Sequence, residues 1–75
     1  MKVYLNSIEK AKRFNLVASQ QEYDVYLASG KFVVDGKSIM GIFSLDLSNP
    51  VDIIIEPEQT DLQEVKNTFK EFFSL

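Results

Sequence analysis

The sequence contains no cysteine and no histidine, and these two absences exclude several kinds of chemistry. Without cysteine, the chain has neither disulfide bonds nor a thiolate nucleophile. Without histidine, it lacks the commonest general base, the commonest metal ligand and the imidazole that can accept a phosphoryl group. The other side chains show no nucleophile–base pair and no glycine-rich phosphate loop. We therefore expect no catalytic residues, no metal and no cofactor, and we do not expect an enzyme.

Long apolar runs and a strong charge of either sign are also absent. No apolar run approaches the roughly 20 residues of a membrane-spanning helix, and the apolar stretch 1–5 is too short for a signal peptide. The 8 basic and 11 acidic residues give a net charge of -3, which argues against non-specific nucleic-acid binding. We therefore expect one small cytoplasmic domain over residues 1–75, with neither a membrane nor a nucleic acid as its partner.

Four short segments alternate apolar and polar residues or are rich in β-branched residues, and both patterns predict strands. The predicted strands span residues 2–5, 23–27, 31–34 and 51–55. The turn signal Ala28-Ser29-Gly30 separates the second and third strands, so these two form a hairpin.

Apolar residues at helical spacing predict two longer helices. The first begins at Asn6 or Ser7, and the last begins at Thr60, which has capping-box spacing with Gln63. We expect the last helix to share one core with the strands, through Leu62, Val65, Phe69 and Phe72 packed with Val3, Leu27 and Ile53. The apolar stripe of the first helix consists of Ile8, Ala11, Phe14, Val17 and Ala18. The basic residues beside or opposite it form either a solvated face or a site for an acidic partner or a phosphate: Lys10, Lys12 and Arg13.

The predicted order is strand, helix, strand, strand, short helix, strand, helix. Alternating strands and one-sided helices imply an α+β fold with helices packed on one face of a sheet. A ferredoxin-like ligand-binding or RNA-binding domain is an alternative, because RNA-binding sheets stack bases on exposed strand aromatics. Only Phe32 and Tyr26 are candidates for stacking, and a lone strand aromatic more often belongs to the core.

A very short helix over residues 38–45 is too apolar for a surface helix with a single buried stripe. Ser38 is a good N-cap for it. Around the helix axis, Ile42 and Leu45 fall on the side of Gly41, whose lack of a side chain allows close backbone approach, so we place this side against the core. The other side carries Ile39, Met40 and Phe43. That side is either an exposed contact patch or a second buried face.

The run Lys37-Ser38-Ile39-Met40-Gly41 resembles the HPr family, the small phosphocarriers of the bacterial sugar phosphotransferase system. The resemblance extends backward to Asp24 and forward to the strand that ends at Ile55. It implies an HPr-like open-faced sandwich of order βαββαβα, in which a four-stranded antiparallel sheet is covered on one face by three helices.

The resemblance fails at the start of the first helix. There the family has a His-Ala-Arg-Pro segment whose histidine carries the phosphoryl group, whereas this chain has Leu5-Asn6-Ser7-Ile8-Glu9. A phosphate ester on Ser7 would be a much poorer phosphoryl donor than a phosphohistidine. Glu9 also places negative charge where the family keeps positive charge. We therefore expect a divergent member that is not a working phosphocarrier.

The resemblance further implies a regulatory site at Ser38. In many HPr proteins of Gram-positive bacteria, a dedicated kinase phosphorylates the matching serine. A phosphate there would lie at a helix N-terminus, which favours negative charge, and Lys37 would partly neutralise it. Ile39, Met40 and Phe43 match the family's partner-docking surface, and we count Lys37 with them as a docking residue. The alternative is that Ser38 is only a helix cap and is never modified.

Two functional hypotheses follow. The first is a non-catalytic HPr-like binding module, with protein partners such as an HPr-type serine kinase, enzymes of the phosphotransferase system or a transcriptional regulator. The second is a phosphocarrier-type protein that contacts the relay enzymes as an inactive competitor. A structural role as a homodimer formed through the apolar patch is a third possibility, so the chain is expected to be a monomer or a weak homodimer.

Overall fold

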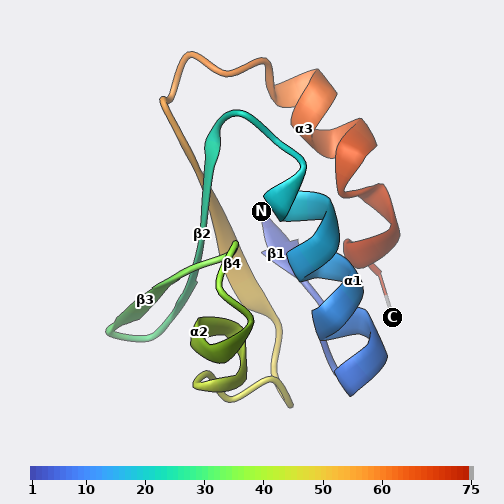
Figure 1. Cartoon of the computed structure of the whole chain (residues 1–75), viewed down its shortest axis with the longest axis vertical. Coiled ribbons are helices and arrows are strands. Elements are labelled where there is room, and N and C mark those ends of the chain that lie inside the picture. The colour runs from blue at the N-terminus through green and yellow to red at the C-terminus, as the bar shows by residue number, and fades with distance from the viewer. Residues whose placement is uncertain (75) are drawn as a thin grey trace.

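The computed structural model describes residues 1–74, which form four strands, three α-helices and one 3₁₀ turn (Figure 1). In chain order these are β1 (Lys2–Val3), α1 (Ile8–Ser19), β2 (Asp24–Ser29), β3 (Phe32–Asp35), α2 (Ile39–Phe43), β4 (Val51–Glu56), α3 (Leu62–Thr68) and the 3₁₀ turn η1 (Lys70–Phe72). The predicted order of strands and helices is confirmed, and so is the α+β fold.

The strands form one antiparallel sheet in the order β1-β4-β2-β3. Leu27 in β2 lies opposite Ile53 in β4 and Val34 in β3. Because directly opposed residues point to the same face of a sheet, these side chains all face the helices. α1 and α3 run side by side along this face, and α2 lies at one end of the sheet (Figure 1).

The core lies between the sheet and the helices, and it confirms most of the predicted core residues. Val65, Phe69 and Phe72 are buried together with Val3, Leu27 and Ile53. The ring centroids of Phe14 and Phe69 are 5.1 Å apart, and those of Phe14 and Phe72 are 5.3 Å apart in a T-shaped arrangement. These rings join α1 to the C-terminal segment. Arg13 and Glu71 add an exposed ion pair between the same two segments.

Two residues expected in the core are exposed instead. Leu62 is 57% exposed and Ile8 is 66% exposed. Each is the first residue of its helix. Helical spacing predicts the direction of a side chain around the axis, but not whether the sheet extends far enough to cover it. The expectation that a strand aromatic belongs to the core is also wrong for Phe32, which is 72% exposed.

The helix caps differ from the predicted ones at one of the two longer helices. Ser7 caps α1, where its Oγ accepts a hydrogen bond from the Lys10 N–H at 3.1 Å. Asp61, and not Thr60, caps α3, and its Oδ1 accepts from the Gln63 N–H at 2.9 Å. The Thr60 hydroxyl instead donates to the Pro57 carbonyl at 2.8 Å. The preceding turn therefore uses the hydroxyl that the capping-box spacing had assigned to α3.

Close backbone approach occurs at Gly36, and not at Gly41 as expected. A Cβ on Gly36 would lie 3.0 Å from both the carbonyl oxygen and a methyl group of Val25. The Gly36 N–H donates to that same carbonyl oxygen at 2.7 Å. A Cβ on Gly41 would lie 3.4 Å from its nearest neighbours, which is ordinary van der Waals contact. Gly36 therefore allows the chain to pass close to β2 before α2 begins.

Candidate docking surface

α2 divides its apolar residues between the core and the solvent. Ile42 is fully buried and Leu45, just after the helix, is 8% exposed, as predicted. On the other side, Met40 is 77% exposed and Phe43 is 41% exposed. Ile39 is half-buried and so contributes less open surface than expected. The expected separation into a core side and a surface side is therefore confirmed for four of these five residues.

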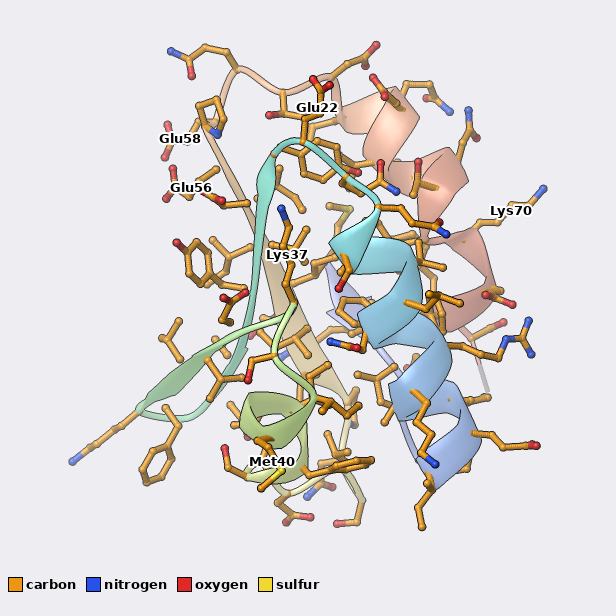
Figure 2. The ribbon with its side chains drawn as sticks, viewed as in Figure 1. Glu22, Lys37, Met40, Glu56, Glu58 and Lys70 are labelled. Carbon is orange, nitrogen blue, oxygen red and sulfur yellow. The ribbon has the colours of Figure 1, made fainter. Side chains whose placement is uncertain are left out.

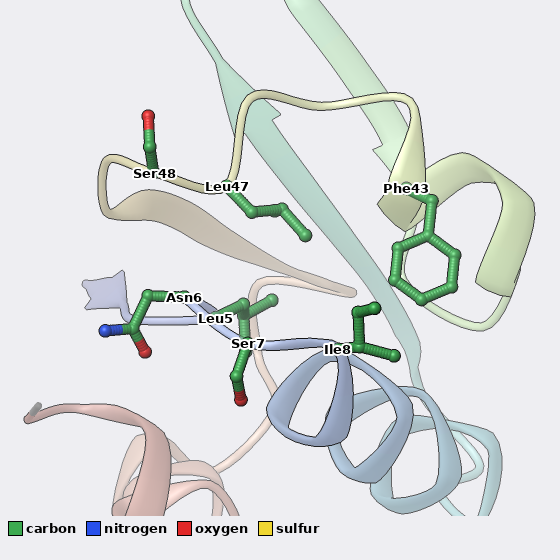
Figure 3. Close-up of a pocket in the computed structure, with 7 residues that line it drawn as sticks. All are labelled: Leu5, Asn6, Ser7, Ile8, Phe43, Leu47 and Ser48. Carbon is green, nitrogen blue, oxygen red and sulfur yellow. The ribbon is translucent and has the colours of Figure 1, made fainter.

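A surface pocket of about 300 Å³ lies between the start of α1 and the end of α2. In Figure 3, Ile8 lies beside the Phe43 ring, and Leu47 points into the space between the two segments. Both Ile8 and Leu47 were missed as site residues, since the helical stripe placed Ile8 in the core and Leu47 lies outside any helix. We call this pocket, together with the neighbouring Met40, the α1–α2 surface. The pocket residues are Leu5, Asn6, Ser7, Ile8, Phe43, Leu47 and Ser48.

A small turn holds Leu47 at this pocket. The Ser48 hydroxyl donates to Asp46 Oδ1 at 2.6 Å, and the Ser48 N–H donates to the same oxygen at 3.1 Å. Both bonds lower the pKa of Asp46, because hydrogen bonds to a carboxylate favour its charged form, and the bond from the Ser48 hydroxyl has the larger effect. Leu47 lies between the two bonded residues and packs partly against the core. The turn therefore fixes one wall of the pocket.

Ser38 is the N-cap of α2, as predicted. Its Oγ accepts a hydrogen bond from the Gly41 N–H at 3.2 Å, and its carbonyl accepts from the Ile42 N–H at 3.0 Å. Its backbone is extended, with φ of -106° and ψ of 113°, as usual for an N-cap. The residue is half-buried. The hydroxyl thus already serves the first turn of the helix.

Lys37 does not turn toward Ser38. Its Nζ donates to the Gln21 carbonyl at 2.9 Å, beyond the C-terminal end of α1. In Figure 2 the Lys37 side chain extends away from Met40 along the neighbouring strand. The ammonium group that was expected to neutralise a phosphate on Ser38 is therefore bonded to the loop after α1.

Ser7 lies just before α1, in the region where the resemblance places the family's phosphate-accepting histidine. The Ser7 Oγ is occupied in capping the helix, and Glu9 lies in the first turn. Figure 3 shows the Ser7 hydroxyl pointing away from Phe43 and Leu47. Within residues 1–74, no group of three or more acidic residues is placed to hold a metal ion.

Comparison with known proteins agrees with this geometry. A family model described as the PTS HPr component phosphorylation site matches residues 8–74. The chain therefore belongs to the HPr family, a family of phosphocarrier and regulatory proteins. Comparison with curated proteins gave no match. No helix among residues 1–74 has the length and apolar character needed to cross a membrane.

A solved structure shows the same relationship. The chain is similar to the catabolite repression protein Crh of Bacillus subtilis, with 29% sequence identity and a TM-score of 0.64. The similarity covers 100% of this chain and 90% of the Crh chain. The Crh structure is described as an intertwined dimer formed by an unexpected domain swap.

Proposed function

We propose that this HPr-family chain is a regulatory binding module that does not carry phosphate on histidine and is not an enzyme. The absence of histidine from the whole sequence supports the loss of the relay reaction. Ser7 does not replace it, because its Oγ caps α1 and a serine ester is a poor phosphoryl donor. Family membership also leads us to place the protein in the cytoplasm, where the phosphotransferase relay operates.

The α1–α2 surface is the proposed docking site, and its exposed apolar side chains are the observation that carries the proposal. Ile8, Met40 and Phe43 are all more than two-fifths exposed; Ile8 and Phe43 line the pocket, and Met40 belongs to the same short helix as Phe43. Exposed methionine suits a surface that adapts to more than one partner. The proposed partners are an HPr-type serine kinase, phosphotransferase-system enzymes or a transcriptional regulator. Of the other two predicted docking residues, Ile39 is half-buried, and the Lys37 side chain is bonded to the Gln21 carbonyl, away from Met40.

Ser38 is the proposed regulatory phosphorylation site. Its Oγ already accepts the Gly41 N–H, so phosphate oxygens would have the same donor available. The phosphate would add a charge of about -1.5 to -2 next to Ile39 and Met40, which follow Ser38 by one and two residues. We expect it to change the choice of partner and to leave the fold intact, because negative charge is favourable at a helix N-terminus.

Two assays test the proposal. Incubation with phosphoenolpyruvate and enzyme I of the phosphotransferase system should give no acid-labile phosphoprotein. Binding to purified candidate partners should be weakened by Phe43→Ala and unchanged by Leu16→Ala, a control residue that is also apolar and exposed but lies further along α1, outside the pocket. A stoichiometric acid-labile adduct would refute the loss of the relay. Equal binding losses in the two variants would refute the docking surface.

The runner-up is a self-associating or competing protein, and the domain-swapped dimer described for Crh favours self-association. In this chain β1 contains two residues, lies at the edge of the sheet and pairs only with β4 among the described strands. It is therefore the element that a swap would exchange most readily. A monomer mass by sedimentation at all concentrations up to the millimolar range would exclude this role. An inactive competitor would instead slow phosphoryl transfer between enzyme I and an active HPr in a mixed assay.

A further inference from the structure

A second hollow lies at the β1 edge of the sheet and shares no residue with the α1–α2 pocket. Its volume is about 530 Å³, compared with about 300 Å³ for the α1–α2 pocket. It lies between β1 and the C-terminal segment α3–η1, and the proposed function does not involve it. Its lining residues are Met1, Lys2, Tyr4, Lys66, Lys70 and Phe73, and we call it the lysine pocket.

The two walls of the lysine pocket are fixed to each other. The Tyr4 N–H donates to the Phe72 carbonyl at 2.8 Å, which ties the residue after β1 to η1. Val3 and Phe72, which precede the lining residues Tyr4 and Phe73, are both buried in the core. The backbones of the two walls are therefore held together before any ligand arrives, which lowers the entropic cost of binding.

Positive charge at the lysine pocket is only partly compensated. Lys2 pairs with Asp52 at 3.2 Å. Lys66 in α3 and Lys70 in η1 are four positions apart in the sequence and line the same pocket, and no acidic residue stands three or four positions from either of them. Among residues 1–74, the ion pairs are Lys2–Asp52 and Arg13–Glu71, so neither Lys66 nor Lys70 takes part in one. Two like charges at this spacing repel each other, and a bound anion would relieve that repulsion.

This concentration of positive charge contrasts with the rest of the chain. Three of the 8 basic residues line one pocket in a chain with 11 acidic residues and a net charge of -3. Figure 2 shows Glu56 and Glu58 on the opposite side of the view from Lys70, whose side chain extends outward from the C-terminal segment. Apart from Asp52, which pairs with Lys2, no acidic side chain forms an ion pair with a lining lysine among residues 1–74.

We propose that the lysine pocket binds a small organic anion with an apolar body, of the class of medium-chain carboxylates. The apolar chain would lie on Met1, Tyr4 and Phe73, and the carboxylate would accept hydrogen bonds from the lysine ammonium groups at the rim. A preformed pocket with apolar walls and a few charged groups is the usual architecture of a small-molecule site.

Titration of the ¹⁵N-labelled protein with sodium octanoate, followed by NMR, tests the proposal. We expect saturable amide shifts at Lys2, Tyr4, Lys66, Lys70 and Phe73, and weaker binding at higher salt. The neutral analogue 1-octanol should bind more weakly, because it lacks the charge. Absence of shifts up to the solubility of octanoate, or equal affinity for octanol, would overturn the proposal. Shifts confined to Ile8 and Phe43 would do the same, because they would place the ligand in the other pocket.

A double variant tests the role of the charges directly. Lys66→Gln/Lys70→Gln should weaken octanoate binding about fivefold to tenfold, since each exposed charge contributes modestly. Lys12→Gln/Lys31→Gln removes the same number of charges away from the pocket and should leave the affinity unchanged. Equal weakening in the two double variants would contradict a local site. The amide dispersion of each variant shows that it is folded, and the salt dependence of the unsubstituted protein requires no variant at all.

Discussion

α2 and the C-terminal segment α3–η1 are both rich in large apolar residues, yet they are buried to different extents. Phe69 and Phe72 are buried against Phe14, which closes the core between the helices. In α2, which has five residues, only Ile42 is buried, and the Met40 side chain is largely exposed to solvent. The comparison shows that apolar content alone does not predict burial. A longer segment that runs along the sheet is covered, whereas a short helix at its end presents one side to solvent.

Of all the substitutions considered, Phe69→Ala in the buried C-terminal segment should destabilise the protein most. Its ring is fully buried and contacts two other rings, so we expect a loss of about 3–5 kcal/mol in the free energy of unfolding. In a domain of this size such a loss would unfold much of the protein. Denaturant titration measures it. A loss below about 1 kcal/mol would show that the core does not depend on this ring.

Leu45→Ala tests the core side of α2. The side chain is 8% exposed, so we expect a cavity cost toward the lower end of about 2–5 kcal/mol. Denaturant titration under the same conditions as for Phe69→Ala allows the two sides to be compared. If Leu45→Ala has no effect, then α2 is attached to the core only through Ile42.

Gly36→Ala and Gly41→Ala separate the approach to α2 from the helix itself. A Cβ on Gly36 meets the Val25 carbonyl, and we expect a loss of about 1–3 kcal/mol from overpacking. Gly41→Ala should be neutral or stabilising by up to about 1 kcal/mol, because the site has room and alanine favours helix. Thermal unfolding of both variants measures the difference. The opposite order would mean that the original assignment of close approach to Gly41 was right.

Met40→Ala tests the solvent-exposed side of α2. Because Met40 is 77% exposed, the free energy of unfolding should change by only a few tenths of a kcal/mol, about the usual range for a surface substitution. Partner binding should nevertheless weaken. Amide hydrogen exchange of residues 39–45 and binding can be measured on the same samples. A loss as large as that of Leu45→Ala would show that both sides of α2 belong to the core.

Replacing Tyr23, whose neighbours Glu64 and Thr68 belong to α3, should have the smallest effect on stability, and only at high pH. Burial raises the pKa of Tyr23, the Glu64 carboxylate adds to the rise, and the Thr68 hydroxyl opposes it. The pKa of Tyr23 in the folded protein lies above the unfolded value of about 10. The contribution of neutral, partly buried Tyr23 to the free energy of unfolding is therefore complete below pH 10 and is lost as the pH rises through the folded-state pKa. Tyr23→Phe should therefore flatten part of the fall in stability above pH 10. Unfolding curves of both proteins between pH 9 and 12 check this, and parallel curves would contradict it.

The fold was predictable from the sequence because its periodicities are strong. The alternation around Val25 and Leu27, and the helical spacing of Val65, Phe69 and Phe72, depend only on the direction in which each side chain points. The same spacing does not indicate whether a residue near the end of a helix is covered by the rest of the protein. Ile8 and Leu62 share the stripes of their helices but occupy the first position, where nothing covers them.

The candidate site was predicted only in part, for a related reason. Ser38, Met40 and Phe43 belong to one short run, and their arrangement follows from local helix geometry. Ile8 and Leu47 reach the same pocket from distant parts of the chain, which only the tertiary structure reveals. The bond from Lys37 to the Gln21 carbonyl is likewise a long-range contact that no local pattern indicates.

The ring contacts between α1 and the C-terminal segment bear on the order of events during synthesis. Phe14 is made early, but its partners Phe69 and Phe72 follow more than fifty residues later. β1 likewise waits for β4, which begins at Val51. Such distant pairings make folding slow to start, because long loops must close before their contacts stabilise anything. We expect chains that end before residue 69 to expose Phe14, and ribosome-bound chains extended by a C-terminal linker should become protease-resistant only after residue 72 has left the ribosome.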